Sequence, residues 1–265
     1  MKLPTLKPMN LPTILSWLIP LLVPVVLTLG AVRLVLFPWF VRFQYSMPGF
    51  PADPYGFTKQ ERLRYSRLAL DYLLNDAGIS YLGDLRFPQG QEAPPMVCLE
   101  MTDCTHLYTE RELSHMVDVK KTVQVAMGIL YISLASLVIL GLWAWRGKWM
   151  GDFRRAVQRG GWLMVALIGV MLLFVFTIFD WFFTFFHNIF FAAGTWQFYD
   201  SDTLIRLFPE HFWVVTFIVV GGLAGLMGLA LGIFLREKRV ASPALIAESP
   251  PEETPDSKVD QAPTA

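Results

Sequence analysis

Residues 122–145 read TVQVAMGILYISLASLVILGLWAW, and no charged side chain interrupts this run. A helix of about 20 apolar residues is long enough to cross the hydrocarbon core of a bilayer. Three other apolar stretches of sufficient length are found at 11–37, 162–186 and 212–235. Because segments that span lipid must satisfy their backbone groups internally, the sequence predicts an all-α membrane protein, a four-transmembrane-helix bundle.

The overall composition agrees with a membrane protein and argues against a nucleic-acid partner. Of the 265 residues, 54% are hydrophobic and 17% are charged. Lys plus Arg and Asp plus Glu number 22 each, so the formal net charge is zero and no basic surface for nucleic acid is expected. The stretch 11–37 is too long for a secretory signal, and no small-residue cleavage site follows it. It is therefore predicted to remain as the first span.

The charges between the spans predict how the chain is threaded. The segment 146–161 carries five basic residues and a single acidic one. By the positive-inside rule this loop is cytoplasmic. The segment 1–10, which carries Lys2 and Lys7, is assigned to the same side, and so is the segment 236–265, which begins with the basic residues Arg236, Lys238 and Arg239. The segments 38–121 and 187–211 are then extracytoplasmic. The tail 236–265, rich in Pro, Ala, Glu and Ser, is predicted to be disordered.

The segment 38–121 is too long for a simple connection and is predicted to form a small, mainly helical extracytoplasmic cap between the first two spans. Two capping boxes mark helix starts in it, Thr58 with Glu61 and Thr109 with Glu112. The first helix is expected to end near Asn75. The second is expected to continue without a break into the span at 122–145.

Cys98 and Cys104 are the two cysteines of the chain, and both fall in the predicted outer compartment. A disulfide that closes this short loop is compatible with an oxidising environment, and so is a pair of free buried thiols. Their spacing matches no common zinc pattern, so no metal is expected here.

Two histidines near the outer ends of the second and third spans are the candidates for chemistry. With Arg146 and Arg159 as the inner boundary, His115 lies about 31 residues outward and His187 about 28. At ~1.5 Å per residue the difference in height is only ~5 Å, so the two imidazoles can share one site. Imidazole titrates near neutral pH and serves as a general acid or base. An ordinary amphipathic residue at the interface is the alternative interpretation of either histidine alone.

Three charged residues in or near the spans have both functional and structural interpretations. Asp118 lies one turn from His115 and is positioned to orient that ring. Asp180 lies within 162–186. A carboxylate in lipid is energetically costly, so Asp180 is a functional candidate. Arg33 is either a donor to a developing oxyanion or a residue that snorkels to the interface. The glycines of the fourth span recur at four-residue spacings, which indicates close helix packing and no function.

Two runs of the sequence resemble a known family. The chain closely resembles the lipoprotein intramolecular transacylase family of bacteria in the run Thr109-Glu-Arg-Glu-Leu-Ser-His115-Met-Val-Asp118-Val-Lys120. It is similar to the same family from His187 through Trp196 to Asp202-Thr-Leu-Ile-Arg-Leu-Phe-Pro209. The chain departs from the family pattern in Phe191-Ala-Ala-Gly-Thr before Trp196 and in its acidic tail, and both departures bear on substrate preference.

The resemblance implies a bacterial plasma (inner) membrane acyltransferase that moves the sn-2 acyl chain of a diacylglyceryl lipoprotein. The acceptor would be the α-amino group of the same lipidated cysteine, and the product would be the lyso form. The family's two histidines match His115 and His187, which are thus implied as acid/base residues. The supporting residues are Asp118, Arg33, Asp180, Asp202 and Trp196. The partners are a lipid-modified protein N-terminus and bilayer lipid, and the reaction requires no cofactor.

Two other classes of function remain open. A non-enzymatic scaffold or sensor would bind another protein through the cap, and substitutions of the histidines would then be silent. A small transporter would carry polar residues across the membrane, whereas most polar residues here cluster at the outer side. The inverted repeats and paired broken helices of transporters are not evident in the sequence.

Overall fold

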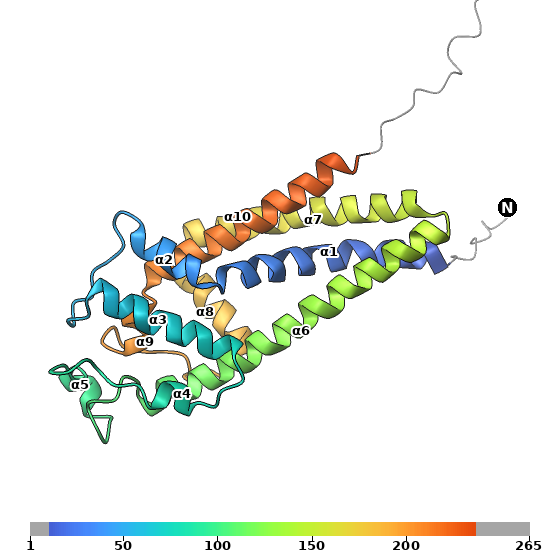
Figure 1. Ribbon diagram of the computed structural model, residues 1–265. Helices are drawn as coiled ribbons and strands as arrows, with labels where there is room; N and C mark the ends of the chain where they lie inside the picture. The colour runs from blue at the N-terminus through green and yellow to red at the C-terminus, as the bar shows by residue number, and fades with distance from the viewer. Residues whose placement is uncertain (1–10, 237–265) are drawn as a thin grey trace, which may run out of the picture.

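The computed structural model describes residues 11–236 and shows long helices that carry a smaller cap at one end (Figure 1). Four helices are long and apolar enough to cross a membrane: α1 (Leu11–Val35), α6 (Glu110–Arg146), α7 (Met150–Thr177) and α10 (Glu210–Phe234). Within the described range there is no strand, only an isolated bridge between Arg86 and His106. The prediction of an all-α membrane protein with four spans is confirmed.

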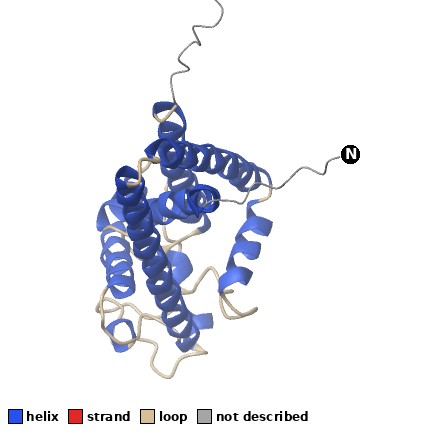
Figure 2. Ribbon diagram, turned by 90° about the vertical axis from the view of Figure 1, so that its right-hand side faces the viewer, coloured by secondary structure: helices blue, strands red, loops and turns tan. Residues whose placement is uncertain are grey.

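Helices α1, α7 and α10 lie side by side, whereas α6 diverges from them toward the cap (Figure 1). Figure 2 looks along the bundle and places α1, which the N-terminal trace enters, near its centre. The backbones of α7 and α10 approach closely at two glycines, since a Cβ built on Gly161 would lie 2.5 Å from the Gly228 carbonyl oxygen. The predicted packing role of the glycines in the fourth span is therefore confirmed.

Gly228→Val is expected to destabilise the bundle, because a Cβ at this position would lie 2.9 Å from the Gly161 carbonyl oxygen and 2.9 Å from the Met164 Cβ. Overpacking of this kind costs about 1–3 kcal/mol. Gly222→Val is the matched control, since nothing lies within 4 Å of a Cβ built there. Thermal unfolding in detergent should show a lower Tm for the first variant only. Equal Tm values for the two variants would contradict the close approach.

The third apolar stretch is broken, so the prediction of one span over 162–186 is wrong. Helix α7 begins at Met150, inside the predicted loop 146–161, and after Thr177 the chain continues as α8 (Phe179–Phe190) in a new direction (Figure 1). At the break the Thr177 hydroxyl donates to the Leu173 carbonyl oxygen at 2.7 Å. A bond of this kind can bend a helix slightly. The same bond at Ser136 and Thr216 leaves α6 and α10 unbroken, so it does not by itself explain the break.

The cap consists of α2 (Pro38–Ser46), α3 (Lys59–Leu74), α4 (Ser80–Gly83), α5 (Pro95–Cys98), α9 (Thr203–Leu207) and the first turns of α6. Both predicted capping boxes are present, and α6 runs unbroken into the second span. Cys98 and Cys104 form a disulfide, so the first of the two interpretations holds. The cap is mainly helical, and α9 comes from the predicted loop 187–211. The end of the bundle that carries the cap is called the cap end below.

A buried ion pair joins two parts of the cap that are far apart in sequence. Asp53 precedes α3 and Arg206 lies in α9, and their side chains are 0% and 1% exposed. Arg206 Nε and Nη2 donate to the two Asp53 carboxylate oxygens at 3.1 and 3.0 Å. The Arg206 guanidinium also lies 3.7 Å from the centroid of the Phe57 ring. Because a two-point pair restricts orientation as well as distance, it fixes α9 against the loop before α3.

The predicted cytoplasmic segment 1–10 lies outside the described residues, and so does the predicted tail beyond Arg236.

Candidate active site

The first histidine is placed by the start of α6. The Thr109 hydroxyl accepts a hydrogen bond from the Glu112 amide, and Glu112 Oε2 accepts one from the Thr109 amide at 2.8 Å. The other Glu112 oxygen, Oε1, accepts from the Leu204 amide at 2.7 Å and so joins α6 to α9. Glu112 is fully buried. His115 follows one turn later on a helix whose start is therefore fixed.

The second histidine lies in the last turn of α8. Its Nδ1 is 2.9 Å from the carbonyl oxygen of Phe183. A carbonyl oxygen can only accept, so in the neutral ring Nδ1 carries the proton and Nε2 carries the lone pair. Burial lowers the pKa of His187 from the ordinary 6.5, and the hydrogen bond to Phe183 opposes this shift in part. His187 is therefore mainly a neutral base at pH 7.

Both imidazoles pack against one ring, that of Phe191. Its centroid lies 5.0 Å from the centroid of His115 and 5.8 Å from that of His187. The two imidazole centroids are thus no farther apart than the sum of these distances. His115 is 9% exposed and His187 is 8% exposed. The structure brings the two predicted residues together at the cap end, as the helical rise had indicated.

Two further aromatic side chains complete the surroundings of the pair. The Trp196 ring lies 4.7 Å from that of His187, and its Nε1 donates to Asn188 Oδ1 at 3.2 Å. The Phe198 ring lies 5.3 Å from that of His115. Trp196 therefore lies beside the pair, and its supporting role stays a prediction.

Asp202 contacts neighbours of the pair and not the imidazoles themselves. It is fully buried, and its Oδ2 accepts from Arg111 Nη2 at 2.9 Å and from the Tyr199 amide at 2.8 Å. Asp202 also precedes the first residue of α9. Its contacts place it at the end of the segment that covers the histidines, and not against either imidazole.

The remaining predicted supporting residues make no hydrogen bond or ring contact with the pair in the described part of the chain. Asp118 accepts from Lys121 Nζ at 3.4 Å and makes no hydrogen bond to an imidazole there. Asp180 lies on the surface of the protein in the first turn of α8, where a carboxylate is favourable, and its supporting role stays a prediction. The Arg33 guanidinium lies 4.2 Å from the Phe37 ring, near the end of α1.

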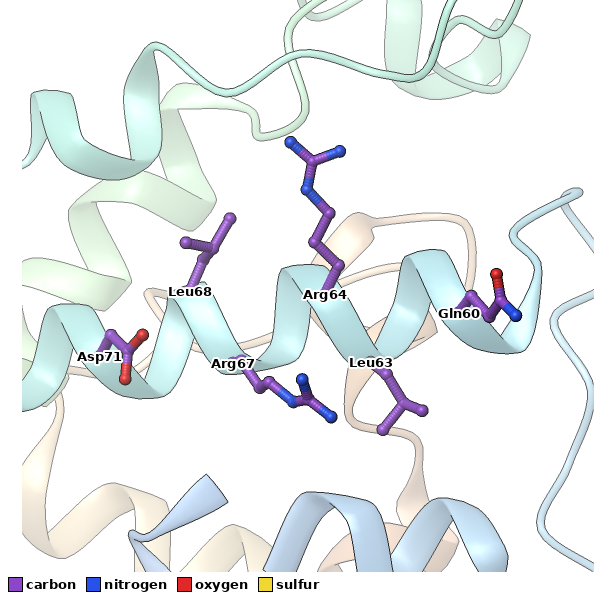
Figure 3. A pocket seen from close by; sticks show the side chains of 6 residues that line it. All are labelled: Gln60, Leu63, Arg64, Arg67, Leu68 and Asp71. Atoms are coloured by element: carbon purple, nitrogen blue, oxygen red, sulfur yellow. The ribbon is translucent and has the colours of Figure 1, made fainter. Parts of the chain in front are cut away.

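The two cavities described in the structure lie away from the histidines. The larger, about 520 Å³, follows one exposed face of α3 (Figure 3) and is lined by Gln60, Leu63, Arg64, Arg67, Leu68 and Asp71. The second, about 330 Å³, lies among α1, α6, α7 and α10. Neither borders the histidine pair, which is enclosed by its own neighbours. Between residues 11 and 236 no three His, Cys, Asp or Glu side chains gather closely enough to hold a metal ion.

Phe191 and Phe198 contact the pair, and Arg111 contacts Phe198, but none of the three was predicted as a site residue from the sequence. Arg111 lies four residues before His115, so the two share one face of α6. That spacing is a signal that could have identified Arg111. No comparable signal identifies Phe191 or Phe198, because they lie in an irregular segment whose path the sequence does not specify.

These features define a multi-pass helical membrane protein with a buried histidine pair at the cap end of its bundle. The family model described as lipoprotein intramolecular transacylase Lit matches residues 15–213. The chain belongs to this family, whose members are transferases.

Relatives of known sequence or structure extend the comparison. An uncharacterized protein of Aquifex aeolicus (strain VF5) is 30% identical over 194 residues, which cover 72% of this chain and 78% of that protein. The membrane integral lipoprotein intramolecular transacylase Lit from Bacillus cereus matches with a TM-score of 0.62 and 18% identity, over 82% of this chain and 92% of that chain. A histidine-to-arginine variant of the same protein gives a TM-score of 0.56 at 19% identity, over 83% and 92%. These structures show that the fold is shared.

Proposed function

We propose that this protein transfers the sn-2 acyl chain of a diacylglyceryl-modified lipoprotein to the α-amino group of the same lipidated cysteine. The product is the lyso form, an isomer of the substrate. The observation that carries the proposal is the pair His115 and His187, packed on one aromatic ring at the cap end of a membrane bundle. Membership of the family supports the reaction class.

The acceptor amine must be deprotonated before it can attack an ester. An α-amino group has an ordinary pKa of about 8 and is mostly protonated at neutral pH. His187 is suited to act as the base, because its Nδ1 proton is held by the Phe183 carbonyl and its lone pair is on Nε2. Once the amine is neutral, its nitrogen forms a bond to the carbonyl carbon of the sn-2 ester.

The second half of the reaction breaks the ester bond. The bond from the carbonyl carbon to the glyceryl oxygen is cleaved, and that oxygen needs a proton to leave as an alcohol. We assign this donation to His115, the other member of the pair. The proton that His187 takes from the ammonium form is first released to solvent. During the attack the amine nitrogen gives a second proton to His187, His187 passes a proton to His115, and His115 donates it to the leaving oxygen. Both imidazoles end neutral, one proton per transfer is released, and no water or co-reactant is consumed.

The substrate itself supplies the proximity that the reaction needs. Donor ester and acceptor amine belong to one molecule, so the enzyme has only to hold them in an orientation that permits attack. The side of α8 opposite the pair exposes Trp181, Phe185 and Ile189, which are suited to contact with acyl chains. A lipid-anchored substrate would therefore approach from the bilayer.

The proposed orientation places the cap outside the plasma (inner) membrane of a bacterium. The basic segment 146–161, which includes the turn between α6 and α7, favours the cytoplasmic side, and so does the basic flank after α10. The Cys98–Cys104 disulfide supports an oxidising environment for the cap. The pair would then face the outer leaflet, where lipidated cysteines are anchored.

The reaction can be tested with the purified protein and two synthetic diacylglyceryl lipopeptides of different peptide mass. One of them carries a deuterated sn-2 chain. Fragmentation by mass spectrometry should show an acylated amine on each peptide, with each chain retained on its own peptide. Exchange of the label between peptides would contradict an intramolecular transfer, and a free amine on both would contradict the reaction.

A further inference from the structure

Residues 191–202 join α8 to α9 and are called the cover segment here. This segment places three aromatic rings on the imidazoles: Phe191 contacts both, Trp196 contacts His187 and Phe198 contacts His115. The two histidine residues are consequently only 9% and 8% exposed. An amine and an ester of a lipid-anchored substrate cannot reach either ring while the cover segment stays in this position.

The chain after the cover segment is firmly held, and so provides a fixed end. The Thr203 hydroxyl donates to the Leu107 carbonyl oxygen, and the Leu204 amide donates to Glu112. Within the cover segment the contacts are mostly local, such as the turn in which Ala192 accepts from Thr195. Residues 192–195 are exposed. Movement would therefore be confined to the cover segment, while α9 stays in place.

Arg111 makes the charged contact that holds the cover segment against α6. Its Nη2 donates to the buried Asp202 carboxylate at 2.9 Å and lies 3.3 Å from Glu100 Oε2. The same guanidinium lies 5.6 Å from the Phe198 ring centroid and 5.1 Å from that of Tyr199. One side chain thus ties the end of the cover segment, the ring over His115 and the disulfide-closed loop together.

We infer that the cover segment opens to admit substrate and that Arg111 is the positioning residue that latches it closed. Arg111 acts through Asp202 and Phe198 and need not touch the reacting atoms. The inference deepens the proposed function, since the same movement decides when a substrate reaches the pair. It concerns the exposure of the imidazoles, which can be measured without any acyl transfer.

The test is the rate at which diethyl pyrocarbonate acylates each histidine of the full-length protein in detergent micelles, followed by peptide mass spectrometry. Arg111→Gln should speed modification of His115 and His187 by about tenfold, because a hydrogen bond to a charged group shifts an opening equilibrium by roughly that factor. His106 is the internal control, because it lies in the cap and contacts Asp103 and Arg86 instead of the cover segment. Its rate should not change.

Two further variants keep the result interpretable. Arg111→Lys keeps the charge but loses the planar fork, so it should give an intermediate rate. Arg64→Gln removes an exposed arginine of α3 and should match the wild type. Unchanged rates at His115 and His187 in both Arg111 variants would overturn the latch. Equal acceleration at His106 would also overturn it, since that result means general loosening. Neither outcome bears on the lipopeptide assay, so the two proposals can fail separately.

Discussion

His115→Ala and His187→Ala should each reduce formation of the lyso form by about 10²–10⁴-fold, the usual contribution of a general acid or base. His187→Ala removes the Nε2 lone pair that the Phe183 carbonyl sets up. His115→Ala removes the proposed donor to the leaving oxygen. The initial rate of N-acylation, measured by mass spectrometry with a synthetic diacylglyceryl lipopeptide, reports both effects.

The matched control for these variants is His106→Ala. His106 contacts Asp103 and Arg86 in the cap, and none of its contacts in the described structure involves the pair. It should retain the wild-type rate. All three proteins should insert and unfold at similar temperatures. If His115→Ala or His187→Ala acylated the amine at the wild-type rate, the mechanism would be refuted. That result is the one expected if the protein is a scaffold or sensor and the histidines have no catalytic role.

Asp53→Ala should strongly destabilise the cap while leaving the spans assembled. The substitution leaves the Arg206 guanidinium buried without its carboxylate partner, which costs about 3–5 kcal/mol. It also removes the acceptor of the Phe57 amide. Hydrogen exchange of backbone amides should show faster opening of α9 and of the start of α3. Exchange in α7 and α10 should be unchanged, because their packing does not involve this pair.

Two proteins control for this effect. Asp84→Ala removes an exposed cap carboxylate and should leave exchange unchanged. The double variant Asp53→Leu with Arg206→Met removes both charges, so it should be less destabilised than Asp53→Ala. Wild-type exchange in α9 of the Asp53→Ala protein would mean that the ion pair does not hold the cap together.

Much of the fold could be predicted because its signals are local. A run such as 122–145 has one stable arrangement in lipid, and the Thr58 and Thr109 boxes each mark a helix start within four residues. The break at Ile178 could not be predicted in this way. It falls within a long, mainly apolar stretch, and residues 176–180 contain no glycine or proline that would mark it. The pairing of Asp53 with Arg206 was also missed, because it joins residues far apart in sequence.

The candidate site shows the same division. His115 and His187 could be matched in height because the rise of a helix is constant, and the break before α8 does not separate them. Their neighbours depend on the irregular path of residues 191–202, which no periodicity specifies. Asp118 illustrates the limit, since its one-turn spacing from His115 is real but its carboxylate pairs with Lys121.

The central claim is that His115 and His187 form one catalytic unit, and the double variant His115→Ala with His187→Ala tests it most directly. Residues that act as a unit have strongly non-additive effects on rate. The initial rate of N-acylation by the double variant should therefore equal that of either single variant within a few fold. A double variant whose loss equals the product of the two single losses would show that the histidines act independently, and the proposed site would then be wrong.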